Sequence, residues 1–210
     1  MNLRRWPWFS ILSLSIIGGF QVAGQFNPAV HGTLHSVFAL DYGDVTHLRL
    51  QRLVMSPLVQ TRPGFVGTVF WFALVLLPWL ELTVGSLGTA VTFFLGDWIS
   101  TLSTLGVLRA TAAFGSFSAE HLLHQPDSGS SSGAFACAGA LVILGPRWLR
   151  FVGFLALAAF LAWRLLAFHR LYDVQHLLAT LTGSVIALAI VHWPRLSTVR
   201  PHLPRRPAVE

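Results

Sequence analysis

Two polar positions in an otherwise apolar chain could carry nucleophilic chemistry. The serine-rich run 127–133 (DSGSSSG) leads directly into the apolar stretch 134–144, and His176 lies near the start of a later apolar stretch. A serine hydroxyl is a weak nucleophile at neutral pH and needs a neighbouring base, most often histidine, to take its proton. The sequence supplies one of each, which favours a Ser–His dyad at the mouth of two membrane helices.

The surroundings of the serine run support this interpretation. A loop changes into a helix there, so free backbone N–H groups would face a developing oxyanion. Small residues four apart, Ala136 with Ala140 and Ala179 with Gly183, favour close packing of the two helices. The competing interpretation is structural: Ser128 or Ser130 caps the helix, and the histidine makes an ordinary interfacial hydrogen bond.

Composition excludes an ordinary soluble domain. Hydrophobic residues make up 54% of the 210 positions, charged residues 10%, and the mean hydropathy is +0.64. These values predict an all-α integral membrane protein, because backbone polar groups inside a bilayer must be satisfied within helices. The single cysteine, Cys137, lies in an apolar stretch and cannot form an intrachain disulfide, so a buried structural thiol is expected.

Six apolar runs are long enough to be drawn as helices at or across the membrane, which predicts a six-transmembrane-helix bundle. They cover residues 8–25, 65–84, 87–107, 131–145, 149–168 and 174–193. The fourth run is short, which suits a helix that begins below the membrane surface in a protein-lined cavity. The first run, with Arg4-Arg5 before it and Ala23-Gly24 near its end, also fits a cleavable signal peptide.

All 14 basic residues are arginine, with concentrations at residues 4–5, at 147 and 150, and in the tail from 195 to 206. Positive residues remain in the cytoplasm, so an even number of spans places both termini there and predicts a plasma-membrane protein. The basic charge needs no nucleic acid to explain it. Residues 1–193 are expected to form one membrane domain, with residues 26–63 as an external amphipathic loop and 194–210 as a basic, disordered cytoplasmic tail.

Several motifs resemble those of the rhomboid intramembrane serine proteases, over roughly residues 45–190. The family's fourth span opens with GxSG and a glycine eight residues after the serine. Here Gly129-Ser130-Ser131-Ser132 and Gly139 match if Ser131 is the nucleophile, with Ser132 in place of the second glycine. An alternative register makes Ser132 the nucleophile but misplaces Gly139.

Two further motifs carry the resemblance. The family's HxxGxxxG is matched from His176 to Gly183, with Ala179 in place of the first glycine. The LExxxGS motif at the end of the second span is reproduced by Leu80 to Ser86. The resemblance implies that Ser131 attacks a peptide bond in or near the transmembrane segment of another protein, and that His176 transfers the proton. It implies no metal or organic cofactor.

One family feature is absent from the sequence. Rhomboid proteases carry HxxxN at the start of the second span, where both side chains donate hydrogen bonds to the oxyanion. Counting back from Glu81 puts Phe65 and Val69 at those places. The chain is more similar to a divergent branch in which DxGxSxG replaces the usual serine motif. An inactive rhomboid-like protein that binds transmembrane clients is therefore the alternative, and a small transporter is a weaker one.

Other polar residues offer supporting roles. Asp173 could orient His176 or cap its helix, and Asp127 could cap the serine helix. Asp97 and Arg164 fall inside apolar runs, where they could pair with each other or contact separate polar groups. Glu81 is expected to make a structural hydrogen bond to a loop. The loop histidines at 121 and 124 are either solvated or substitutes for the missing oxyanion donors.

Overall fold

The computed structural model describes residues 6–60, 71–168 and 171–192, and every regular element in these ranges is a helix. The tail at 194–210, and positions 65 and 69, lie outside the described residues. The elements are α1 (Trp8–Phe26), α2 (Pro28–Phe38), α3 (Tyr42–Thr46), α4 (Leu50–Met55), the 3-10 turn η2 (Ser56–Leu58), α5 (Trp71–Ala113), α6 (Phe117–Leu123), α7 (Ser131–Leu144), α8 (Arg147–Phe168) and α9 (Leu171–His192).

The all-helical class is confirmed for the described residues, and their long apolar helices suggest a membrane protein. Four helices of the described chain are long and apolar enough to cross a bilayer: α1, α5 from Ala73 to Ala113, α8 and α9. Helix α5 contains two of the predicted apolar runs, joined where Gly85 leaves helical geometry with φ 81° and ψ 169°. Helix α7 has only 14 residues and is shorter than a full crossing. The number of crossings therefore stays a prediction.

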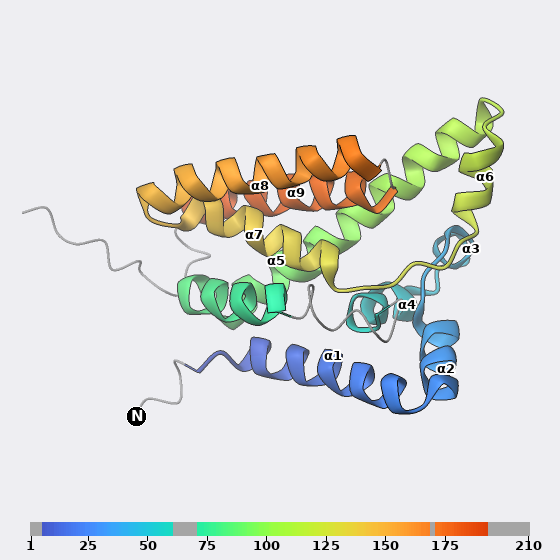
Figure 1. Cartoon of the computed structure of the whole chain (residues 1–210), viewed down its shortest axis with the longest axis horizontal. Coiled ribbons are helices and arrows are strands. Elements are labelled where there is room, and N and C mark those ends of the chain that lie inside the picture. Colours follow the sequence, from blue (N-terminus) through green and yellow to red (C-terminus); the bar gives the residue numbers. More distant parts are fainter. Residues whose placement is uncertain (1–5, 61–70, 169–170, 193–210) are drawn as a thin grey trace, which may run out of the picture.

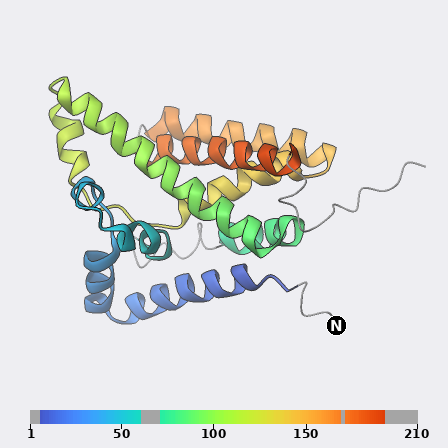
Figure 2. The same ribbon diagram turned by 180° about the vertical axis from the view of Figure 1, so that it is seen from behind.

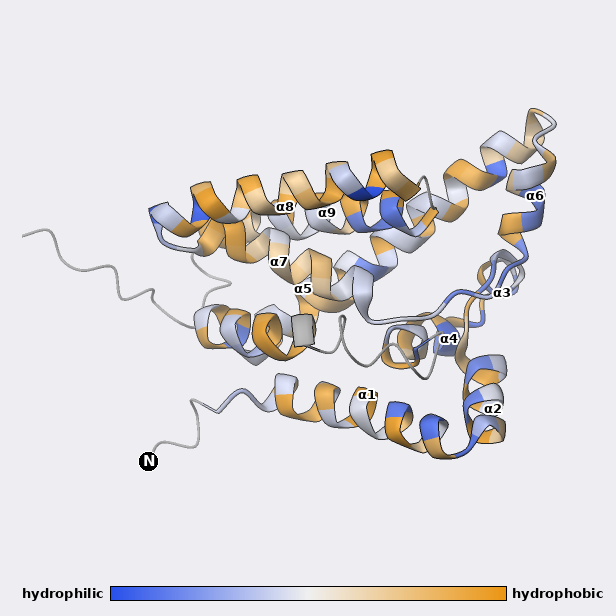
Figure 3. Ribbon diagram, in the orientation of Figure 1, coloured by the Kyte–Doolittle hydropathy of each residue, from blue (hydrophilic) through white to orange (hydrophobic). Residues whose placement is uncertain are grey.

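Helix α7 lies inside the molecule. Figure 1 shows α7, α8 and α9 running side by side, with α5 crossing beneath them and α1 lying along the opposite side. The view from behind shows the same long diagonal path of α5 against α9 (Figure 2). The short helices α2, α3, α4 and α6 gather at one end, close to the start of α7. The outer helices are mostly apolar along their length, and the polar residues concentrate at that end (Figure 3).

Three glycines explain how closely the central helices approach. A Cβ added to Gly183 of α9 would lie 1.9 Å from the carbonyl oxygen of Ala136 in α7, and one on Gly139 would lie 2.2 Å from that of Thr180. A Cβ on Gly96 of α5 would meet the Ala136 Cβ at 2.1 Å. Contacts this close leave no room for any side chain. The predicted small-residue contact between α7 and α9 is confirmed at Ala136 and Gly183.

Glu81 joins α1 to the bend in α5. Its carboxylate accepts hydrogen bonds from the backbone N–H groups of Phe9 (2.8 Å) and Ser10 (2.7 Å) at the start of α1, and from the Ser86 hydroxyl just past the bend. A carboxylate suits the positive end of a helix. The expected structural role is correct, but its main partner is a helix N-terminus and not a loop.

The segment between α1 and α5 is held by one buried acid. Asp44, 2% exposed, accepts hydrogen bonds from Arg49 (3.0 Å) and Arg52 (2.9 Å). Arg52 also donates to the carbonyls of Ser36 and Ala39. The Trp98 indole of α5 donates to the Leu53 carbonyl (2.9 Å), which fastens this segment against the bundle. The described part of this segment, residues 27–60, is therefore bonded within itself, to α5 and to the serine loop.

Candidate functional site

The serine loop is held by backbone contacts to the segment before α5. Leu40 and Asp127 exchange two backbone hydrogen bonds of 2.8 Å, and the Gly129 N–H donates to the Ser56 carbonyl at 3.0 Å. Gly129 has φ +147°, a conformation that residues with a side chain rarely adopt. This glycine therefore lets the chain turn from the loop into α7 at a fixed position.

The N-terminus of α7 carries open hydrogen-bond donors. Ser130 is the N-cap residue, yet no side chain caps the helix, and the first backbone bond runs from the Ala134 N–H to the Ser130 carbonyl. The N–H groups of residues 131–133 have no partner in the described structure. The capping interpretation of Ser130 is wrong, because its hydroxyl instead accepts a hydrogen bond from the Gln60 amide at 2.8 Å. Open donors at a helix start suit an oxyanion.

His176 of α9 packs against α7 one turn beyond Ser131. Its ring stacks on the Phe135 ring of α7, with centroids 4.3 Å apart. The centroid of the Tyr172 ring, one turn earlier in α9, lies 5.8 Å from that of His176. The histidine is 8% exposed, and its buried Nε2 has no hydrogen-bond partner. A buried polar atom without a partner is costly, so it is normally satisfied in some working state of the protein.

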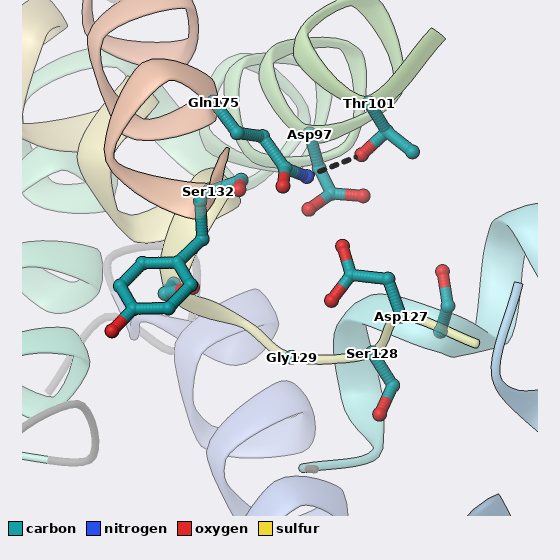
Figure 4. Close-up of a pocket in the computed structure, with 10 residues that line it drawn as sticks. Asp97, Thr101, Asp127, Ser128, Gly129, Ser132 and Gln175 are labelled. Atoms are coloured by element: carbon teal, nitrogen blue, oxygen red, sulfur yellow. Dashed lines mark hydrogen bonds between the residues drawn. The ribbon is translucent and has the colours of Figure 1, made fainter. Parts of the chain in front are cut away.

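The two residues of the predicted dyad lie on neighbouring helices but are not bonded. No hydrogen bond joins Ser131 to His176 in the described chain, although α7 and α9 form its most extensive helix contact. Ser131 is half-buried, whereas Ser132 is 3% exposed. Both line a small pocket (Figure 4), which His176 does not line. The greater exposure of Ser131 favours it as the nucleophile in the preferred register.

An ion pair fixes the turn of α9 that precedes His176. Asp173 is fully buried and accepts a 2.8 Å hydrogen bond from the Arg164 guanidinium of α8, which also lies over the rings of Phe168 and Tyr172. Of the two alternatives for Asp97 and Arg164, a mutual pair is therefore wrong, and Arg164 makes a separate contact with Asp173. Asp173 lies inside the first turn of α9 and does not cap it, so a role in positioning His176 stays open.

The loop histidines do not reach the site. His121 contacts Gln125, and His124 pairs with Glu120 at 3.6 Å, all on or next to α6 and exposed to solvent. They do not line the pocket beside Ser131. Capping of α7 by Asp127 is also wrong, because no side chain caps this helix. Gln60 could not be found from the sequence, since a lone glutamine in an amphipathic loop has no motif that would connect it with the serine run.

The surroundings of this loop shift the pKa of two groups, Asp127 and His35. Asp127 is exposed as a whole residue, but desolvation of its carboxyl group raises its pKa, and its hydrogen bonds with Gln175 and the Ser128 N–H partly oppose the rise. Burial and the neighbouring His31 lower the pKa of His35, and the charge of Asp127 works against that lowering.

No cluster of three or more metal-ligating side chains is found in the described ranges.

No family model, curated protein or solved structure matches this chain.

Proposed function

We propose that the chain is a rhomboid-like serine protease that cleaves peptide bonds in or near transmembrane segments of other membrane proteins. Ser131 attacks the scissile carbonyl, and His176 accepts the hydroxyl proton and returns it to the leaving amine. The motifs around residues 80–86, 129–139 and 176–183 support the assignment. The observation that carries it is the stacking of His176 on Phe135, one helical turn from Ser131, with a buried Nε2 that lacks a partner.

The oxyanion would be held by this chain's own donors. The open N–H groups at the start of α7 face the space in front of Ser131 in this proposal, and the Gln60 amide supplies a further donor next to it. Such donors compensate for Phe65 and Val69, which cannot donate from their side chains. Losing one oxyanion donor typically costs about 100- to 1000-fold in rate. In this scheme a short movement of His176 past Phe135 forms the dyad bond.

Six crossings and cytoplasmic termini in the plasma membrane complete the proposal. Ser131 and His176 then lie toward the outer surface, where water can enter beside the loop formed by residues 26–63. A cysteine-accessibility experiment tests the orientation. Cysteine introduced at Ser118 should react with an impermeant maleimide on intact cells, whereas cysteine at Ser197 should react only after permeabilisation.

Covalent labelling tests the activity. Purified protein is treated with a fluorophosphonate that modifies activated serines, next to Ser131→Ala, Ser132→Ala and His176→Ala variants, with Ser118→Ala as the control. Labelling that disappears in Ser131→Ala and His176→Ala and persists in the other two supports the dyad. Loss only with Ser132→Ala, among the serine variants, shows that the other register is correct.

A second candidate is an inactive rhomboid-like protein that binds the transmembrane segments of clients. The absence of a Ser131–His176 hydrogen bond favours it, as do the apolar side chains at the family's oxyanion positions. This alternative predicts no fluorophosphonate labelling of the wild type, together with saturable binding of transmembrane peptides that survives Ser131→Ala. Labelling of the wild type at Ser131 rules it out.

A further inference from the structure

A pocket next to Ser131 is bounded by two carboxylates that face each other. Asp97 projects from α5, Asp127 projects from the serine loop, and the carboxyl groups point toward one another across the space between them (Figure 4). The cavity measures about 30 Å³, and the hydroxyls of Ser56 and Thr101 also line it. We call it the acidic pocket.

Asp97 has no side-chain partner among the described residues. It is 4% exposed, and no hydrogen bond or ion pair to its carboxylate occurs in the described structure, although it lines the pocket. The charge of Asp127 across the pocket repels that of Asp97. The Gln175 amide, which could have donated to it, is directed to the Thr101 hydroxyl at 2.7 Å. A buried carboxylate in this state is costly unless a cation or a proton compensates it.

The described chain supplies little positive charge here. Arg164 is engaged with Asp173, and Arg49 and Arg52 are engaged with Asp44. His35 lies close enough to interact with Asp127, but its own burial and His31 disfavour its charged form. Among the described residues, no arginine therefore compensates the carboxylates of the acidic pocket.

The size and donors of the pocket identify the class of that group. A divalent metal ion usually requires six or more oxygen ligands, often several carboxylates, and only two carboxylates meet here. An ammonium group carries three N–H donors on a compact centre, which two carboxylates and a hydroxyl can satisfy. The volume holds one such group or one to two waters. A planar guanidinium is larger and fits less well.

We propose that the acidic pocket binds the lysine side chain of the residue beside the scissile bond, or of the equivalent residue in a bound client. This inference rests on the proposed function for its substrate class, because Ser131, the candidate nucleophile, lines the pocket. Asp97 supplies a buried charge that selects the ammonium. Asp127 closes the pocket from the loop.

A binding experiment tests the proposal without requiring hydrolysis. The probes are three fluorescent peptides with one shared apolar membrane segment, differing only at one juxtamembrane residue, which is Lys, Arg or Met. The full chain carrying Ser131→Ala is titrated with each peptide in detergent micelles, and anisotropy reports binding. Lysine is expected to bind at least about tenfold more tightly than methionine, as expected for charged hydrogen bonds, with arginine between them.

Isosteric variants connect that preference with the pocket. Asp97→Asn and Asp127→Asn, each added to Ser131→Ala, should reduce the lysine preference to less than about threefold. Glu120→Gln, which neutralises an exposed acid outside the pocket, should preserve it. Gel filtration detects misfolding of either asparagine variant. If one of them misfolds, the other still tests the pocket.

Three outcomes overturn the proposal. Equal binding of the lysine and methionine peptides excludes a lysine site. A lysine preference that survives both asparagine variants assigns it to another surface. A thermal midpoint that Ca²⁺ or Mg²⁺ raises in wild type but not in Asp97→Asn makes the occupant a metal. Fluorophosphonate labelling is independent of these three outcomes. Loss of the lysine preference with labelling intact refutes only the lysine site. Absence of labelling with the lysine preference intact refutes only the protease.

Discussion

Helices α7 and α8 are chain neighbours with opposite environments. Helix α7 buries ten of its 14 residues, most of them Ala, Gly or Ser, and is surrounded by α5, α8 and α9. Helix α8 has 22 residues, of which only Leu161 is buried, and it exposes large side chains such as Trp148, Phe151 and Phe154. Both are strongly apolar, so hydropathy alone does not distinguish them.

The difference shows how apolar side chains serve two purposes in a membrane. Around α7, small residues allow backbones to touch and hold Ser131 against its neighbours, because packing and not water exclusion drives helix association in lipid. Around α8, bulky residues fill space that lipid tails would otherwise occupy. Residue size, more than hydrophobicity, therefore separates the buried central helix α7 from the exposed helix α8.

The largest expected effect comes from adding bulk to α7. Gly139→Leu should leave no folded protein, because even a Cβ at this position lies 2.2 Å from the Thr180 carbonyl oxygen in α9. The loss should exceed about 5 kcal/mol, beyond the usual range for point variants. Ala159→Leu on the exposed side of α8, and Gly106→Leu on α5 where nothing lies within 4 Å, should fold normally. Gel filtration in detergent shows whether each of the three variants is folded. A folded Gly139→Leu protein would contradict the close packing of α7 against α9.

A smaller loss is expected where α8 makes its one ion pair with α9. Arg164→Leu removes the partner of the fully buried Asp173 and should lower the free energy of unfolding by about 3–5 kcal/mol. The double variant Arg164→Leu/Asp173→Leu should recover most of that loss, because no buried charge is left unpaired. Unfolding by denaturing detergent measures both. A double variant as unstable as the single one would show that the pair is not the source of the effect.

The smallest effects come from a matched pair of truncations. Leu141→Ala in α7, where the leucine is 4% exposed, should cost about 2 kcal/mol, the low end for buried leucines, because lipid solvates the removed atoms almost as well as protein does. Leu155→Ala in α8, 50% exposed, should change stability by less than about 0.5 kcal/mol. The same unfolding titration compares them. Equal losses would mean that α8 is buried against another protein surface.

The helices could be predicted from the sequence because continuous apolar runs in a membrane protein have one stable backbone form. All six runs lie in helices wherever they are described, and the small-residue spacing predicted the contact of Ala136 with Gly183. Those predictions depend only on local composition and on helical spacing.

The partners of the charged residues could not be predicted in the same way. Asp97 and Arg164 have the residue types of an ion pair, but Arg164 pairs with Asp173 and Asp97 faces the serine loop. Side-chain pairing depends on the rotation of each helix and on loop segments from distant parts of the chain. Gln60 illustrates the same limit, since its contact with Ser130 spans 70 positions. The dyad itself stays a prediction.

The contact between Glu81 and the start of α1 also has a consequence for biosynthesis. The bonded residues Ser10 and Glu81 are 71 positions apart, so at about 5–20 residues per second the ribosome delivers the carboxylate roughly 4–14 s after the helix it binds. Helix α1 is therefore complete before its carboxylate partner exists, and its docking onto Glu81 is a late assembly step.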